Sequence, residues 1–222
     1  RFEFDIDPDV EAAAQELSDR LTIVSAERIR VELDLLLMTE RPSLGLDFIV
    51  RTGLAEHFLP ELPGLALEQD PVHHHKDVLT HTYAVIEKVR RVTDSTETEP
   101  EGRSNLVVRL AALFHDVGKP KTRAFTEKGV TFHGHDHVGA RMTKKRMAAL
   151  KYSQQMIDDV AKLVELHLRF HTYAMGWSDA AVRRYVRDAG HLLDELNELT
   201  RCDCTTRNRR KAQELDRRMN EL

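Results

Sequence analysis

The sequence predicts an all-α protein in which a small helical unit precedes a larger helical bundle, with one short β-hairpin near residues 122–132. Apolar side chains recur at helical spacing through most of the chain, and capping and stop residues bracket these stretches. The 222 residues are 41% hydrophobic and 32% charged, which is an ordinary globular composition. It excludes membrane-embedded, collagen-like and largely disordered proteins.

The first predicted helix runs from Ser25 to about Thr39. Ser25 is a suitable N-cap because its hydroxyl can accept a hydrogen bond from a backbone N–H of the first turn, where Glu27 also interacts favourably with the helix dipole. Pro42 ends the helix, because proline has no N–H to donate. The apolar side of this helix consists of Ile29, Leu33, Leu36 and Leu37.

Two shorter helices complete the N-terminal unit. One begins at Ser43 and ends near Gly53, a residue type that favours helix C-termini, and the next covers residues 54–59. The segment Leu62–Pro71 is rich in proline and contains a glycine, so it predicts a linker. We therefore expect residues 1–70 to form a helical body domain.

Longer helices follow the linker, interrupted by a polar surface loop over residues 93–104. We expect one domain over residues 71–205 and a separate basic helix over residues 206–222. The predicted helices cover about 75–92, 104–116, 136–150, 153–169, 178–189, 191–203 and 207–221.

The predicted hairpin lies between the second and third of these helices. Residues Thr122–Phe125 and Val130–Phe132 contain β-branched and aromatic side chains, and they flank the turn sequence Glu127-Lys128-Gly129. This is the one stretch with strand character in an otherwise helical sequence.

The net charge of −4 conceals two unlike parts. Residues 1–70 contain 16 acidic and 6 basic side chains, whereas residues 71–222 contain 21 acidic and 27 basic ones. The basic excess of the second part suits a polyanionic partner.

The chain contains two cysteines and no apolar N-terminal segment ahead of a cleavage site. This pattern argues against a disulfide scaffold and against a secreted precursor, so a cytoplasmic protein without a membrane partner is expected. The sequence leaves the oligomeric state open.

Three polar side chains fall where their helices should bury hydrocarbon. His167 continues an apolar row of helix 153–169, and Asp203 continues the row formed by Leu192, Leu196 and Leu199. A single histidine in such a position is more often a hydrogen-bonded core residue, and a single aspartate is more often structural or exposed. Three such residues in one domain favour a shared ligand, because a buried carboxylate needs a cation or hydrogen-bond donors. His81 lies on a face with Val78, Val85 and Val89.

A further apolar helix ends in the adjacent pair His115-Asp116, which Gly118 and Lys119 follow. Neighbouring side chains at a helix end diverge by about 100°, which lets both reach one metal from different sides. If His81, His115, Asp116 and Asp203 converge, they supply three or four ligands and leave positions open for water and substrate.

These residues resemble the H…HD…D signature of the HD superfamily of metal-dependent phosphohydrolases. The sequences HDVGK at His115–Lys119 and HxxxG at His135–Gly139 are also typical of that superfamily. The resemblance implies a helical bundle of the HD-domain type that uses a divalent metal.

Longer segments resemble the C-terminal part of bacterial, actinobacterial-type CCA-adding tRNA nucleotidyltransferases. The N-terminal unit, in turn, resembles the helical RNA-binding body that follows the nucleotide-selecting neck in those enzymes. The resemblance covers essentially the whole chain, and its clearest segments are HHHKDVLTHT (73–82), LAALFHDVGKP (110–120), TFHGHDHVGA (131–140) and LTRCDCTTRN (199–208).

The sequence contains no counterpart of that family's nucleotidyltransferase head. Nucleotidyl transfer there requires a Gly-Ser motif followed by two metal-binding carboxylates, and a Glu-Asp-x-x-Arg element selects the incoming nucleotide. The sequence begins just after this element, at Arg1-Phe2. We therefore expect that this chain does not add CCA on its own.

The resemblance implies one or two divalent metal ions. Asp116 would bridge the first site to a second one formed by His135 and His167, and a single-metal site is the alternative. His133 and His137 are rivals of His135, which has the family spacing to Gly139. The donors suit Mn, Ni, Co, Fe, Zn or Mg alike.

The remaining site predictions concern the substrate. Asp116 and Lys119 are the expected catalytic residues, and Lys119 also follows the metal-binding pair closely enough to contact a phosphate. Arg169 and His171 lie beyond His167 and could bind the phosphate or ribose, although an exposed surface is an equal alternative.

Two functions follow from these patterns. The first is a phosphohydrolase that acts on terminal or 2′,3′-cyclic phosphates of RNA, including tRNA ends, or of small nucleotides. The second is an RNA-binding body in which the HD site is structural or vestigial. The basic residues expected to hold RNA near the C-terminus are Arg207, Arg209, Arg210 and Lys211.

Overall fold

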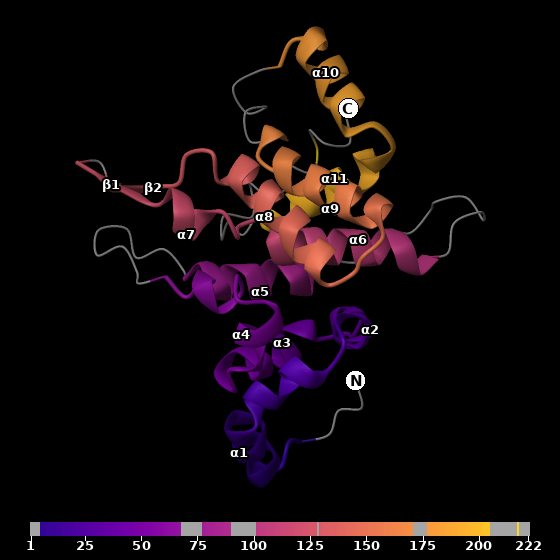
Figure 1. Ribbon diagram of the computed structural model, residues 1–222. Coiled ribbons are helices and arrows are strands. Elements are labelled where there is room, and N and C mark those ends of the chain that lie inside the picture. Colours follow the sequence, from indigo (N-terminus) through magenta and orange to yellow (C-terminus); the bar gives the residue numbers. More distant parts are fainter. Residues whose placement is uncertain are drawn as a thin grey trace.

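The computed structural model describes residues 5–67, 77–89, 101–127, 129–170, 177–204 and 217. Figure 1 shows the N-terminal helices gathered at one end of the molecule and the larger helical bundle at the other. The N-terminal elements are α1 (Pro8–Glu16), η1 (Ser18–Ile23), α2 (Ala26–Leu37), α3 (Pro42–Arg51), α4 (Leu54–Phe58) and η2 (Pro63–Leu65).

The N-terminal helices begin at residues that suit helix starts. The Ser25 hydroxyl accepts a hydrogen bond from the Arg28 N–H at 3.4 Å and caps α2, as predicted. Helix α3 begins at Pro42 and not at Ser43, because the fixed φ of proline is already helical at the first position. Helix α1 begins in the same way at Pro8, behind the capping side chain of Asp7.

The sequence reasoning missed α1 and the η1 turn after it. Neither element contains a buried residue, so no apolar stripe marks them in the sequence.

The second part of the chain is helical, as predicted. Within the described ranges, no helix is both long and apolar enough to span a bilayer. Its helices are α5 (Val78–Lys88), α6 (Glu101–Phe114), α7 (Lys119–Thr122), α8 (His135–Ala149), α9 (Gln154–Leu166), α10 (Asp179–Ala189) and α11 (Leu193–Asp203), with the turn η4 (Gly190–Leu192) before α11.

Helix ends differ from the expected ones by a few residues. Helix α5 begins at Val78, because the Asp77 carboxylate accepts a hydrogen bond from the Thr80 N–H at 3.2 Å and caps it there. Helix α6 ends at Phe114, so the His115-Asp116 pair lies in the turn that follows. The predicted helix 207–221 lies outside the described residues, apart from Arg217.

The predicted hairpin is present as β1 (Ala124–Thr126) and β2 (Gly129–Thr131), an antiparallel pair in which Phe125 faces Val130. The short helix α7, which was not predicted, leads directly into β1. In Figure 1 the hairpin extends away from the helices of the bundle.

The core of the bundle forms around α6 and α9. Helix α8 packs along α9, and α5 and α11 pack against α6. Fully buried side chains on α6 and α9 include Leu110, Phe114, Val160 and Leu163. This packing brings the ends of α6, α9 and α11 close to the start of α8.

One continuous core joins the N-terminal helices to the bundle, because α2 packs on α6 and α3 packs on α5. The partly buried Arg109 of α6 reinforces this joint by donating hydrogen bonds to the Leu37 carbonyl and, at 2.6 Å, to the Thr39 carbonyl. Arg146 of α8 forms an ion pair with Glu61 at 2.8 Å.

Replacing Arg109 should weaken this joint. In Arg109→Met the apolar stem is kept, but the carbonyls that end α2 lose their donor, which should lower the free energy of unfolding by about 1–3 kcal/mol. Urea unfolding followed by circular dichroism measures this change. The control Arg187→Met alters an arginine whose side chain is 74% exposed, and should shift stability by less than about 0.5 kcal/mol. Equal effects of the two variants would contradict the role of Arg109.

Candidate metal centre

Four histidines and two aspartates converge at the centre of the bundle. They come from five separate places: α5, the turn after α6, the start of α8, the turn after α9 and the end of α11. In that order they are His81, His115 with Asp116, His135, His167 and Asp203. The structure therefore brings together all six residues that the sequence proposed as ligands.

The first group consists of His81, His115 and Asp203, whose ligand atoms lie within 4.8 Å of one another. His81 Nε2 is 2.9 Å from Asp203 Oδ1 and 3.2 Å from His115 Nε2. His115 is fully buried, and Asp203 is 12% exposed at its side chain. Three donors, from α5, the turn after α6 and α11, thus face one small space.

The second group consists of Asp116, His135 and His167, and all three are buried. Asp116 Oδ1 is 3.3 Å from His135 Nε2, whereas Asp116 Oδ2 is 3.2 Å from His115 Nε2 of the first group. The two oxygens of this carboxylate therefore face different groups. Among the described residues, the buried Nε2 of His167 has no hydrogen-bond partner.

Backbone carbonyls orient three of the histidine rings. The Nδ1 atoms of His115, His135 and His167 lie 2.8, 2.8 and 2.6 Å from the carbonyl oxygens three residues earlier in the chain, those of Ala112, Phe132 and Val164. A carbonyl only accepts, so each Nδ1 carries a hydrogen, and whenever the ring is neutral its Nε2 presents a lone pair. Metal-ligating histidines are commonly held in this way.

Burial and neighbouring charges shift the pKa values of three residues in the cluster. Burial alone would lower the pKa of His115, but the Asp116 and Asp203 carboxylates outweigh it and raise that pKa to about 8. Burial would likewise raise the pKa of Asp116, yet the charge of His115 and hydrogen bonds from His115 and His135 hold it well below its usual range. Burial, aided by the charge of His115, lowers the pKa of His167 to about 4.

The donor set fits a divalent cation. A buried carboxylate among imidazoles requires positive charge, and the buried Nε2 of His167 requires a partner. Imidazole nitrogens together with carboxylate oxygens suit the first-row divalent metals and, with water ligands, Mg²⁺.

Two glycines allow α8 to approach the turn after α6. A Cβ atom on Gly118 would lie 2.1 Å from the carbonyl oxygen of His135, and one on Gly139 would lie 3.4 Å from the Gly118 nitrogen. The sequence reasoning used Gly118 only as a helix-ending residue. The glycines of the HDVGK and HxxxG motifs were the feature of the sequence that could have indicated this close approach.

Lys119 and Arg169 form ion pairs with protein carboxylates. Lys119 Nζ lies 2.6 Å from Asp116 Oδ2, and its side chain is 21% exposed. Arg169 lies 3.7 Å from Asp188 of α10 and is 49% exposed. His171 falls outside the described residues.

The rival histidines lie away from the cluster. His133 is exposed, and His137 points to Glu165 at 3.4 Å with 57% of its side chain exposed. Arg207, Arg209, Arg210 and Lys211 lie outside the described residues, and their role stays a prediction.

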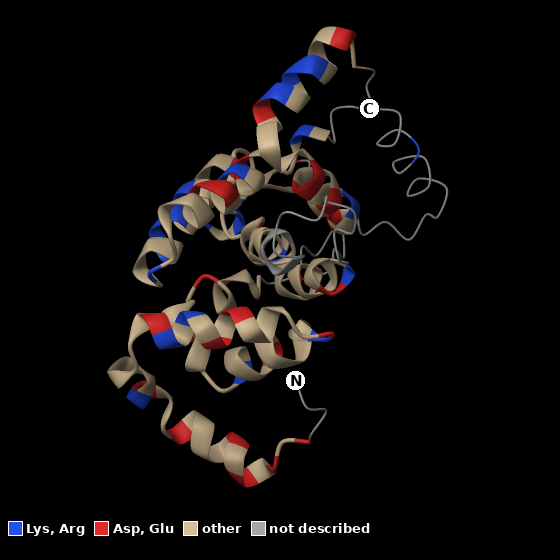
Figure 2. Ribbon diagram, turned by 90° about the vertical axis from the view of Figure 1, so that its right-hand side faces the viewer, with Lys and Arg blue, Asp and Glu red and all other residues tan. Residues whose placement is uncertain are grey.

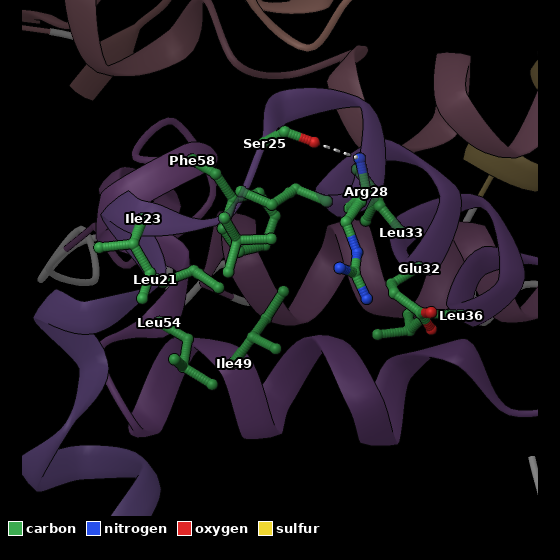
Figure 3. A pocket seen from close by; sticks show the side chains of 12 residues that line it. Leu21, Ile23, Ser25, Arg28, Glu32, Leu33, Leu36, Ile49, Leu54 and Phe58 are labelled. Atoms are coloured by element: carbon green, nitrogen blue, oxygen red, sulfur yellow. Dashed lines mark hydrogen bonds between the residues drawn. The ribbon is translucent and has the colours of Figure 1, made fainter.

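A separate groove lies away from the cluster. A groove of about 710 Å³ lies among η1, α2, α3 and α4 and is lined mainly by apolar side chains, with Arg28 and Glu32 beside them (Figure 3). None of the six clustered residues lines it. The chemistry of the cluster therefore lies in the bundle, apart from this groove.

Comparison with known families divides the chain into two matching segments. Residues 3–65 match the family described as "Probable RNA and SrmB-binding site of polymerase A". Residues 78–217 match the HD domain family, which covers more than half of the chain.

Three relatives illustrate the similarity. An A-adding tRNA nucleotidyltransferase of Deinococcus radiodurans is 32% identical over 90% of this chain and 45% of its own length. A CC-adding tRNA nucleotidyltransferase of Thermus thermophilus is 33% identical over 80% of this chain and 38% of its own length. A multifunctional CCA protein of Pasteurella multocida is 27% identical over 69% and 36%, respectively. The chain thus spans less than half the length of these relatives.

A methyl group at Gly118 should disrupt the cluster. In Gly118→Ala the new Cβ meets backbone that cannot rotate away, so we expect a loss of about 2 kcal/mol or more in unfolding free energy and weaker Mn²⁺ binding. Thermal unfolding and titration calorimetry measure the two effects. Gly64→Ala is the control, because a Cβ there meets nothing within 4 Å. Unchanged Mn²⁺ affinity in Gly118→Ala would argue against this contact.

Proposed function

Because this chain belongs to the HD domain family and aligns with tRNA nucleotidyltransferases over most of its length, we propose that it is a metal-dependent phosphohydrolase. Its substrates would be terminal or 2′,3′-cyclic phosphates of RNA, tRNA ends included, or of small nucleotides. The convergence of four imidazole Nε2 atoms with two carboxylates in the bundle is the observation that carries this proposal.

One metal would be held by His81, His115, Asp116 and Asp203. A second would be held by His135 and His167, with Asp116 as the bridge, because its two oxygens already face the two groups. When bound, such ions polarise a phosphoryl oxygen and make a nearby water a stronger acid.

The chain's own residues would position these donors and the substrate. The carbonyls of Ala112, Phe132 and Val164 hold three imidazole rings in fixed orientation, so little reorganisation accompanies binding. The Lys119 ammonium, now on Asp116, is partly exposed and would contact the substrate phosphate. Asp116 would act as the bridging carboxylate that aligns both groups.

A second candidate function is RNA binding without hydrolysis. It is favoured by the family description for residues 3–65 and by the relatives that act on tRNA. Exposed basic side chains on α8 and α10 would suit an RNA backbone, and Figure 2 shows basic residues along α10. They include Arg141, Lys145, Arg183, Arg184 and Arg187.

Removing the central pair should abolish metal binding and hydrolysis together. We expect the wild type, loaded with Mn²⁺, Ni²⁺, Co²⁺ or Mg²⁺, to hydrolyse 2′,3′-cyclic nucleotides. The double variant His115→Ala/Asp116→Ala should lose more than about 100-fold in rate. Elemental analysis and a phosphate-ester assay measure both properties. His137→Ala changes an exposed histidine outside both groups, so it is the control and should behave like the wild type.

Wild-type protein that binds none of these metals and hydrolyses no cyclic nucleotide would refute the phosphohydrolase. If the same protein still bound tRNA, the second candidate function would be supported instead.

The second metal has its own test. In His167→Ala the second group loses a buried ligand, so the metal content should fall from two ions to one per chain. Elemental analysis after dialysis measures this number, and circular dichroism checks the fold. His191→Ala is the control, because its 70% exposed side chain pairs with Asp159, outside both groups. Equal metal content in the wild type and His167→Ala would contradict a two-metal site.

A further inference from the structure

The β1–β2 hairpin is inserted between two ligand-bearing segments. The chain leaves the cluster after Asp116, forms α7 and the hairpin, and returns to the cluster at His135. The base of the hairpin contacts the cluster directly, because the Phe132 carbonyl lies 2.8 Å from His135 Nδ1. The hairpin is thus an arm that projects from the edge of the proposed active site (Figure 1).

Strand β1 of this arm presents an exposed aromatic ring. Phe125 is 73% exposed, although burial of a phenylalanine side chain is favourable. The Arg123 guanidinium lies 4.8 Å from the centroid of the ring. These residues are two apart in extended chain, so they share one face of the arm.

Positive charge accompanies this ring. Lys119, Lys121 and Arg123 alternate over five residues with no acidic residue among them, and Lys121 is exposed. Lys119 also lies 5.7 Å from the centroid of Phe132, at the base of the arm. Cationic side chains beside an exposed aromatic ring are the combination by which proteins bind single-stranded nucleic acids.

We propose that the hairpin is an RNA-binding arm that delivers a single-stranded RNA end to the metal centre. A base would stack on Phe125, while Lys121 and Arg123 would contact backbone phosphates. Phe125 pairs with Val130, and Val130 precedes His135 by five residues. The backbones of Val130 and His135 therefore lie at most about 18 Å apart. The identity of the delivered phosphate rests on the proposed function, whereas the binding of RNA to the arm does not.

A binding experiment without hydrolysis tests the arm directly. The probe is a fluorescein-labelled ten-nucleotide oligouridylate, and fluorescence anisotropy of the full chain in EDTA gives its affinity. Phe125→Ala should weaken binding roughly tenfold, and Phe125→Trp should retain the affinity because it keeps a stacking surface. Leu44→Ala, which removes a 57% exposed apolar side chain on α3, is the matched control.

A charge variant makes an independent test. Lys121→Gln should weaken binding and should reduce the slope of log K against log salt by roughly one, as expected for one lost phosphate contact. The proposed RNA-binding role of the arm is overturned if Phe125→Ala and Leu44→Ala bind the oligouridylate equally well, or if Phe125→Trp fails to retain affinity. It is also overturned if Lys121→Gln leaves the slope of log K against log salt unchanged.

A hydrolysis assay then distinguishes the role of the arm in RNA binding from the proposed phosphohydrolase activity. The ratio of kcat/KM for a cyclic-phosphate-ended decanucleotide to that for a 2′,3′-cyclic mononucleotide should fall roughly tenfold in Phe125→Ala. Absence of hydrolysis in the wild type would refute the phosphohydrolase, while the anisotropy results would still decide the arm.

Discussion

The buried carboxylate of Asp116 is the constraint around which the bundle is organised. A charge without solvent needs positive or hydrogen-donating neighbours, and those of Asp116 come from His115, His135 and Lys119. His115 belongs to the turn after α6, Lys119 begins α7 and His135 begins α8, so the turn and the start of α8 must lie close together. Gly118 permits their close approach, because a Cβ there would lie 2.1 Å from the His135 carbonyl oxygen.

The proposed metal centre and the proposed RNA-binding arm are connected by one stretch of the chain, between Asp116 and His135. Between Asp116 and His135 lie the ammonium of Lys119, the basic turn of α7 and the arm with Phe125. A segment fixed at both ends by the cluster can therefore present an exposed ring at a defined distance from the reacting groups. The N-terminal helices are joined to this assembly through Arg109 and a continuous core.

Much of the fold was predictable because its signals are local. The hydroxyl of Ser25, the apolar row before His167 and the turn sequence of the hairpin each lie within a few residues of what they determine. Helix α1 was missed because it buries nothing, and α7 because a four-residue helix is too short for any periodicity. The His115-Asp116 pair was predicted as the last two residues of a helix, yet it lies in the turn that follows α6, where both side chains face the cluster.

The sequence by itself determined the helical class, because helical period is a property of short segments, and its motifs together with the resemblance to HD enzymes indicated the six residues that cluster. Tertiary structure alone decided that Asp116 faces both groups, one with each oxygen, and that His167 has a buried Nε2 without a partner among the described residues. It also decided that carbonyls three residues earlier hold three of the rings. These arrangements depend on helix ends far apart in the chain, whose approach is set by side-chain packing and by the backbone contact at Gly118.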